Sequence, residues 1–139
     1  MSYLLDTCVI SELVARQPRE SVSAWVAQLD PDKTYLSVVT LGEIQKGIEK
    51  LPACQRKEDL RAWLKDDLLV RFRGRLLPLD TEVMLDWGAM ISKLETEGTP
   101  MPLIDSLVAA TALHHDLVIV TRNEKDFERS GVELVNPWK

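Results

Sequence analysis

The sequence lacks the features of secreted, membrane-spanning and disulfide-bonded proteins. Its 139 residues include only two cysteines, Cys8 and Cys54, with no cysteine or histidine partner at metal-ligand spacing. They fit free thiols in a reducing compartment better than a disulfide framework. No apolar run approaches the roughly 20 residues of a membrane-spanning helix, and no basic and apolar regions of a signal peptide are present. We therefore expect a cytoplasmic protein that is not bound to a membrane.

The sequence also lacks an excess of basic residues, an internal repeat and a low-complexity tract. There are 17 Lys and Arg residues against 22 Asp and Glu residues, so the formal net charge is −5. This balance argues against a general nucleic-acid coat protein, which needs a positive surface to release counterions. It does not exclude a nuclease that holds divalent metal ions through clustered carboxylates. The question is therefore whether some of the acidic residues converge.

Apolar runs and turn-forming residues predict strands that alternate with helices along the chain. The hydrophobic fraction is 45% and the charged fraction 28%, which is ordinary for a globular protein, and this length normally folds as one domain. The expected strands cover residues 3–5, 35–38, 75–79, 117–120 and 132–135. The expected helices cover residues 7–16, 20–29, 41–51, 55–70, 81–97 and 102–115, with a short helix or loop over 125–129. This alternation predicts an α/β fold with a mostly parallel central sheet.

Acidic residues at the carboxyl ends of the strands are the candidate site residues, because ligands of parallel sheets bind at that edge. Asp6 ends the first strand, and Asp126 follows the most apolar strand. Glu43 is expected in the first turn of the helix after the second strand, and Asp105 in the first turn of the last long helix. We expect Asp6, Glu43 and Asp126 to face the same edge. Asp105 joins them if its helix begins at that edge.

Each carboxylate also has a purely structural explanation. Asp6 fits a helix N-cap, and Asp105 fits the favourable first-turn position of an acid. Glu43 fits a solvated side chain, and Asp126 fits a loop acid. Asp80 follows a strand and precedes a helix in the same way, and we assign it a capping role only. Four acids at one edge repel one another unless cations are present. Mg²⁺ takes oxygen ligands such as carboxylates, and a bound Mg²⁺ activates water for the hydrolysis of phosphodiesters.

Four segments, in the correct order, resemble the motifs of PIN domains. Each carries one of the candidate acids, and the segments are Tyr3–Ile10, Thr40–Ile48, Pro102–Ala112 and Val120–Phe127. The closing Val135–Trp138 is typical of the VapC/FitB-like toxin branch. The resemblance covers essentially the whole chain, residues 1–139. It implies a single PIN domain with an α/β/α sandwich.

The resemblance also implies the activity and partners of such toxins. The chain would be the toxin of a bacterial type II toxin–antitoxin pair, hydrolysing RNA with Mg²⁺, or Mn²⁺, as cofactor. A cognate antitoxin would inhibit it, and the apolar helices between residues 20 and 70 are the expected groove for an antitoxin helix. A homodimer is expected, as is a toxin–antitoxin hetero-oligomer that binds operator DNA through the antitoxin.

The resemblance assigns catalytic and metal-binding roles to the four acids. Asp6 and Asp105 would hold the first ion, and Glu43 and Asp126 would orient water or a second ion. Many PIN domains have an acid where this chain has Asn123. Whether Asn123 or Asp126 fills the fourth position therefore stays open, and so does the number of ions.

Thr7 and Arg122 are the expected supporting residues. Thr7 is placed to hydrogen-bond a metal-bound water or a phosphate, although a hydroxyl also fits the start of a helix. Arg122 is the candidate phosphate contact. The mechanism needs no general-base histidine, and His114 and His115 fit a helix C-terminus, where a cation is favourable.

Two other functions are compatible with parts of the sequence. A catalytically weak or inactive PIN-like binding module is favoured by Asn123. An aspartate-nucleophile phosphatase also begins with a strand and an Asp. Its chemistry needs a second Asp two residues on, where this chain has Cys8.

Overall fold

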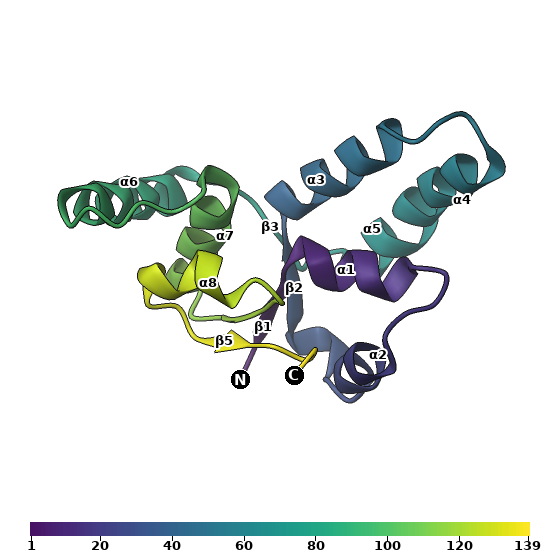
Figure 1. Ribbon diagram of the computed structural model, residues 1–139, viewed down its shortest axis with the longest axis horizontal. Coiled ribbons are helices and arrows are strands. Elements are labelled where there is room, and N and C mark those ends of the chain that lie inside the picture. Colours follow the sequence, from purple (N-terminus) through teal and green to yellow (C-terminus); the bar gives the residue numbers. More distant parts are fainter.

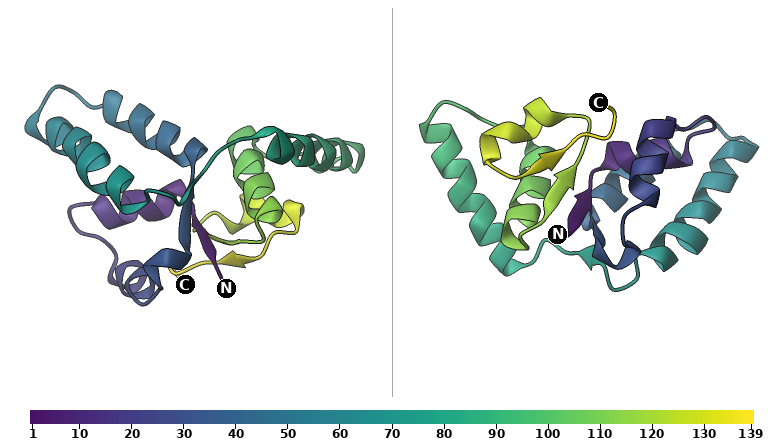
Figure 2. Two further views of the ribbon diagram at one scale, coloured as in Figure 1. Left: turned by 180° about the vertical axis from the view of Figure 1, so that it is seen from behind. Right: turned by 90° about the horizontal axis from the view of Figure 1, so that it is seen from below.

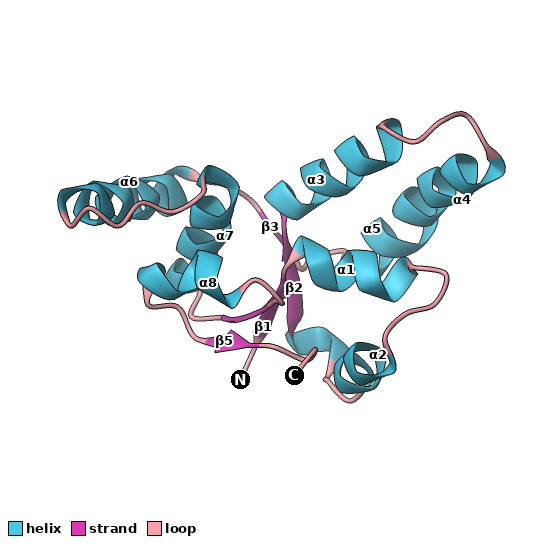
Figure 3. Ribbon diagram, viewed as in Figure 1, coloured by secondary structure: helices cyan, strands magenta, loops and turns pink.

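Five short strands form the centre of the molecule. The computed structural model describes all residues, 1–139. The strands are β1 (Tyr3–Leu5), β2 (Thr34–Ser37), β3 (Leu76–Leu77), β4 (Val118–Val120) and β5 (Leu134–Val135), in the spatial order β3-β2-β1-β4-β5. All four neighbouring pairs are parallel, which confirms the predicted sheet. Figure 3 shows the strands between two groups of helices.

Helices fill the connections between the strands. Those before β3 are α1 (Thr7–Val14), α2 (Glu20–Ala27), α3 (Val38–Glu49), α4 (Gln55–Trp63) and α5 (Leu69–Arg71). Those after β3 are α6 (Thr81–Thr96), α7 (Leu103–His114) and α8 (Glu124–Phe127). Short 3₁₀ segments are η1 (Pro31–Lys33) and η3 (Glu128–Ser130), and η2 (Leu64–Leu68) is a π-helical segment. Figures 1 and 2 show α1–α5 on one side of the sheet and α6–α8 on the other. None of these helices is both long and apolar enough to cross a membrane.

Alternating side chains of the central strands supply two separate cores. Leu5 and Val120 pack in a cluster with residues of α1, α2, α3 and η2. Their neighbours Leu4 and Ile119 pack with residues of α7 and α8 on the opposite face. Successive strand residues point to opposite faces, so short apolar runs such as these serve both layers. The predicted α/β/α sandwich is thereby confirmed.

Several element boundaries differ from the sequence prediction by one to three residues, and one predicted helix is not α-helical throughout. Strand β2 ends at Ser37, whose Oγ accepts a hydrogen bond from the backbone N of Val39 at 3.0 Å, so α3 begins at Val38. Because this cap starts the helix early, Glu43 lies in the second turn of α3 and not in its first. The helix predicted over 55–70 contains the π-helical η2, within which Leu64 and Leu68 are both buried. A single pair of leucines four residues apart fits one turn of either helical form, so this spacing could not reveal the π turn.

Replacing the fully buried Leu4 by alanine should lower the free energy of unfolding by about 2–5 kcal/mol, because it leaves a cavity beneath α7. The control is Leu85→Ala on α6, where the side chain is 69% exposed, with an expected change within about 0.5 kcal/mol. Urea denaturation followed by circular dichroism measures both values. Equal losses in the two variants would contradict the assigned core.

Candidate active site

Asp6 lies at the carboxyl end of the central strand β1 and is buried, with 4% of its surface exposed. Its Oδ1 accepts a hydrogen bond from the backbone N of Thr7 at 2.9 Å. Its Oδ2 accepts one from Thr121 Oγ1 at 2.8 Å, and the Cys8 thiol lies 3.7 Å from the same oxygen. The capping role weighed from the sequence is therefore present. The same contacts also fix both carboxylate oxygens in one orientation.

Glu43 is held near Asp6 by Thr7. The Oγ1 of Thr7 donates to Glu43 Oε1 at 2.5 Å and lies 3.2 Å from Thr40 Oγ1. This contact joins α1 to α3, two helices that both begin at the upper end of the strands in Figure 1. The Thr7 hydroxyl, expected from the sequence to bond a metal-bound water or a phosphate, thus bonds the Glu43 carboxylate in this structure.

Asp105 and Asp126 reach the same edge from the other side of the sheet. Asp105 lies in the first turn of α7, and Asp126 lies in α8. The pKa of Asp105 is raised to about 6, first by burial and then by the charges of Asp6, Asp126 and Glu43. Like charges raise a carboxyl pKa only when they are near one another. The structure therefore brings together the four acids that the sequence singles out.

Burial also raises the pKa of Asp6, and the charge of Glu43 acts in the same direction. Hydrogen bonds from Thr121 and from the Thr7 amide act in the opposite direction, since they favour the ionised carboxylate. Burial likewise raises the pKa of the Cys8 thiol. Cys8 is thus held neutral, which is the unreactive form of a thiol.

The four acids fit a hard divalent cation by their chemistry. As the side chains are oriented, no three His, Cys, Asp or Glu groups form a ready-made set of metal ligands. Mg²⁺ needs no such set, because it commonly binds one or two carboxylates and keeps several waters. No Lys or Arg is among the groups that shift the pKa of Asp105. A cation at this edge would relieve the repulsion among the four acids.

Asn123 and Arg122 follow β4 beside these acids. The backbone N of Asn123 donates to Thr121 Oγ1 at 3.0 Å, and its side chain makes no capping bond. The Arg122 guanidinium lies 5.2 Å from the Trp138 ring centroid, and Trp138 Nε1 donates to Glu12 Oε1 at 3.1 Å. A small pocket of about 490 Å³ is lined by Thr7, Cys8, Ser11, Glu12, Ala15 and Arg122. Arg122 thus lines a pocket next to Asp6 while stacked on the C-terminal tryptophan.

The structure adds residues that sequence reasoning missed. Thr121 is fully buried and bonds Asp6, although it lies 115 positions away in the chain. Thr40 is fully buried next to Thr7, and Trp138 supports Arg122. The one available signal was a hydroxyl residue directly after the apolar run of β4.

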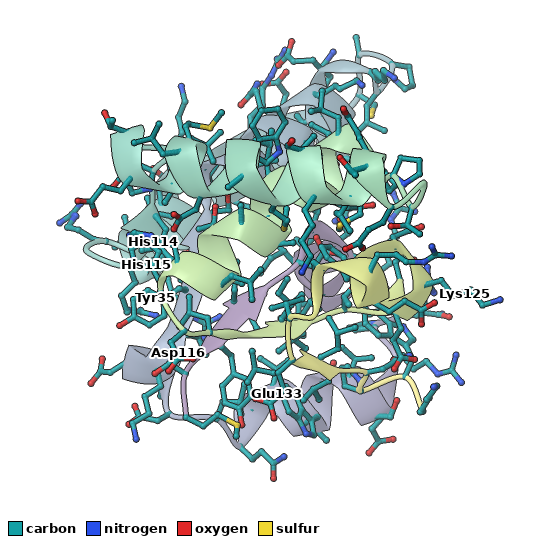
Figure 4. The ribbon with its side chains drawn as sticks, turned by 90° about the vertical axis from the view of Figure 1, so that its left-hand side faces the viewer. Tyr35, His114, His115, Asp116, Lys125 and Glu133 are labelled. Atoms are coloured by element: carbon teal, nitrogen blue, oxygen red, sulfur yellow. The ribbon has the colours of Figure 1, made fainter.

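The histidines lie away from the acids. His114 and His115 are at the C-terminal end of α7, opposite to the first turn that holds Asp105. In Figure 4 both lie on one side of the view, and Lys125 of α8 lies on the other. His114 Nδ1 is 2.7 Å from Asp86 Oδ2, and this bond raises the pKa of His114. The predicted structural role of this pair agrees with these contacts.

A separate apolar groove does not contain the four candidate acids. It has a volume of about 760 Å³ and lies between α1, α2, η2 and α5. Its lining is mostly apolar and includes Leu13, Val14, Val26, Trp63, Val70 and Phe72. The apolar groove and the four acids therefore lie at different places on the molecule. We assign hydrolytic chemistry to the acidic edge, because the groove offers only Asp66 and Asp67 in a mostly apolar lining, whereas four acids act on one another at the edge.

Known proteins are similar to this chain in sequence and in fold. The PIN domain family matches residues 3–132. The chain belongs to the PIN-domain family. It is 37% identical over 135 residues to Toxin FitB of Neisseria gonorrhoeae, covering 97% of each chain. It is 32% identical over 136 residues to VapC ribonuclease Y4jK of Sinorhizobium fredii, covering 98% of this chain and 97% of that protein.

A solved PIN-domain structure superposes closely on this chain. The structure of FitAB bound to an IR36 DNA fragment gives a TM-score of 0.93 at 35% identity, covering 99% of this chain and 96% of that one. The predicted resemblance to PIN domains of the VapC/FitB-like branch is thereby confirmed.

In the metal-free protein, the carboxyl group of Asp105 should titrate with a midpoint near pH 6. The ¹³C NMR shift of that carboxyl group measures the midpoint. The folded-state pKa lies above the ordinary value of an aspartate side chain, 3.8, so between these two pH values the folded chain binds a proton that the unfolded chain has lost. The free energy of unfolding should therefore fall as the pH rises through this window. Both Glu43→Gln and added Mg²⁺ should lower the midpoint. A midpoint at the ordinary value in metal-free protein would contradict the convergence of the acids.

Proposed function

We propose that this chain is the toxin of a VapBC-type toxin–antitoxin pair and acts as a metal-dependent endoribonuclease. The observation that carries the proposal is the gathering of four carboxylates at the carboxyl edge of a PIN fold, where three of them act on the pKa of Asp105. The near full-length likeness to a protein named VapC ribonuclease and to a toxin named FitB supports it.

Asp6 and Asp105 would hold the cation, Mg²⁺ or Mn²⁺. A divalent cation in such a site neutralises charge on a phosphodiester and activates water for attack on phosphorus. Asp6 serves this role from a fixed position, because Thr121 and the Thr7 amide hold its two oxygens. Glu43 and Asp126 flank that pair from α3 and α8, and we assign them to orienting water or a second ion.

Arg122 is the side chain best placed to bind an RNA phosphate. It lines the pocket that contains Thr7 and Cys8, and it forms no ion pair with an acid of the chain. Stacking on Trp138 orders the guanidinium without consuming its donors. RNA contact at this position would bring the phosphate beside Asp6.

Asp6→Asn and Asp105→Asn should each lower the rate of RNA cleavage by about 100-fold or more, because each removes a charged ligand of the cation. The matched control is Asp80→Asn at the N-cap of α6, where Oδ1 accepts from Val83 N at 2.9 Å. Asparagine caps equally well, so that variant should keep full cleavage. Labelled RNA and growth arrest on expression give the readouts, with circular dichroism to verify folding.

The outcomes separate the competing functions. Full cleavage by purified Asp6→Asn would overturn the assignment. A folded wild-type chain that neither cleaves RNA nor binds Mn²⁺ in calorimetry would favour the inactive binding module instead. A trapped aspartyl-phosphate would favour the phosphatase.

The apolar groove between α1, α2, η2 and α5 is the surface we propose for the cognate antitoxin. Its size and apolar lining fit an amphipathic helix, and Asp66, Asp67 and Arg71 supply charges for its polar edge. The similar FitAB structure is bound to DNA, and we propose that operator DNA is bound here through the antitoxin. Homodimerisation stays a prediction, for which the exposed Leu103 offers apolar surface.

Val70→Asp should weaken antitoxin binding by about tenfold or more and leave RNA cleavage unchanged, because Val70 lines the groove and is 49% exposed. Leu85→Asp on α6 places the same charge on an exposed leucine outside the groove and should leave antitoxin binding unchanged. Calorimetry with the purified antitoxin and rescue of growth by its co-expression measure the effect. Equal weakening in both variants would argue against the groove.

A further inference from the structure

Three polar side chains form a hydrogen-bonded row that runs from the core to the site. Thr40 of α3 is fully buried, and the only hydrogen-bond partner of its Oγ1 is Thr7 Oγ1, at 3.2 Å. The Thr7 oxygen is bonded in turn to Glu43 Oε1. Thr40 and Glu43 are three residues apart on one helix, so they lie on the same face of α3. Thr7 approaches that face from α1.

The number of protons fixes the direction of the bond between Thr7 and Glu43. Each hydroxyl carries one proton, and an ionised carboxylate only accepts. Thr7 therefore donates its single proton to the nearer oxygen, Glu43 Oε1, at 2.5 Å. The one other side chain that the Thr7 oxygen contacts is Thr40, at 3.2 Å, so this contact fixes the rotamer in which Thr7 reaches Glu43.

We propose that Thr40 is a positioning residue of the ribonuclease site. Its contact with the Thr7 oxygen keeps the Thr7 hydroxyl turned toward Glu43, and so keeps that carboxylate turned toward the other acids. Thr40 is buried and touches neither substrate nor cation. This inference rests on the proposed ribonuclease activity, which it deepens by adding a residue that acts through two others.

Thr40→Val retains the shape of the side chain and removes its hydroxyl. We expect kcat for RNA cleavage to fall about five- to tenfold, the loss of one ordinary hydrogen bond, with KM unchanged. Thr40→Ser restores the hydroxyl and should restore kcat. The matched control is Thr111→Val in α7, another fully buried threonine, whose Oγ1 donates only to the Leu107 carbonyl at 2.8 Å. A comparable fall of kcat in Thr111→Val would overturn the proposal.

A double-mutant cycle tests whether Thr40 acts through Glu43. In a Glu43→Ala background, Thr40→Val should cause no further loss of kcat, because the carboxylate that it positions is gone. A further five- to tenfold loss in that background would show a general structural effect and would overturn the positioning role.

A metal-free measurement separates this inference from the proposed function. In wild-type protein the Thr7 hydroxyl proton should exchange slowly and show a nuclear Overhauser effect to the Glu43 side chain. Thr40→Val should abolish that signal, and its persistence would overturn the proposal. A wild-type chain without ribonuclease activity would defeat the proposed function, whereas the NMR result still decides whether Thr40 positions Glu43.

Discussion

Repulsion among carboxylates at one end of a parallel sheet is the constraint that shapes this molecule. Parallel strands β1, β2 and β4 end at one edge, so the residues and helices that follow them deliver acids to a common point. Burial, and after it this repulsion, raises the pKa of Asp105 to about 6. Hydroxyl and amide donors from Thr7 and Thr121 hold the neighbouring carboxylates in place. A divalent cation balances such a cluster, which is why the same arrangement suits phosphodiester hydrolysis.

The fold and the four acids could be predicted because they depend on local patterns. Apolar runs mark the strands, and an acid directly after a strand marks the edge where ligands bind. The supporting contacts could not be predicted, because they join distant parts of the chain. Thr121 meets Asp6 across 115 positions, and Thr7 meets Thr40 across 33. The early start of α3 was missed because a single serine hydroxyl, on Ser37, decides it.

The distribution of charge is compatible with the proposed action of this acidic protein on RNA. The four acids carry −4 of the net charge of −5, so the remainder of the chain is close to neutral. Of the arginines near 71–75, Arg75 donates to the backbone carbonyls of Pro31 and Thr34 and has a structural role. Arg122, stacked on Trp138, is the basic group beside the acids. We therefore expect selective, metal-dependent contact with RNA and weak general binding.

The central claim is that these acids form one divalent-cation site. Anomalous diffraction from a crystal soaked in Mn²⁺ tests it most directly, because manganese is located by its own scattering. We expect an anomalous peak between the carboxylates of Asp6 and Asp105, and its disappearance in a crystal of Asp105→Asn. A Mn²⁺-saturated crystal with no peak at this edge, or with its peak on residues outside the four acids, would contradict the account.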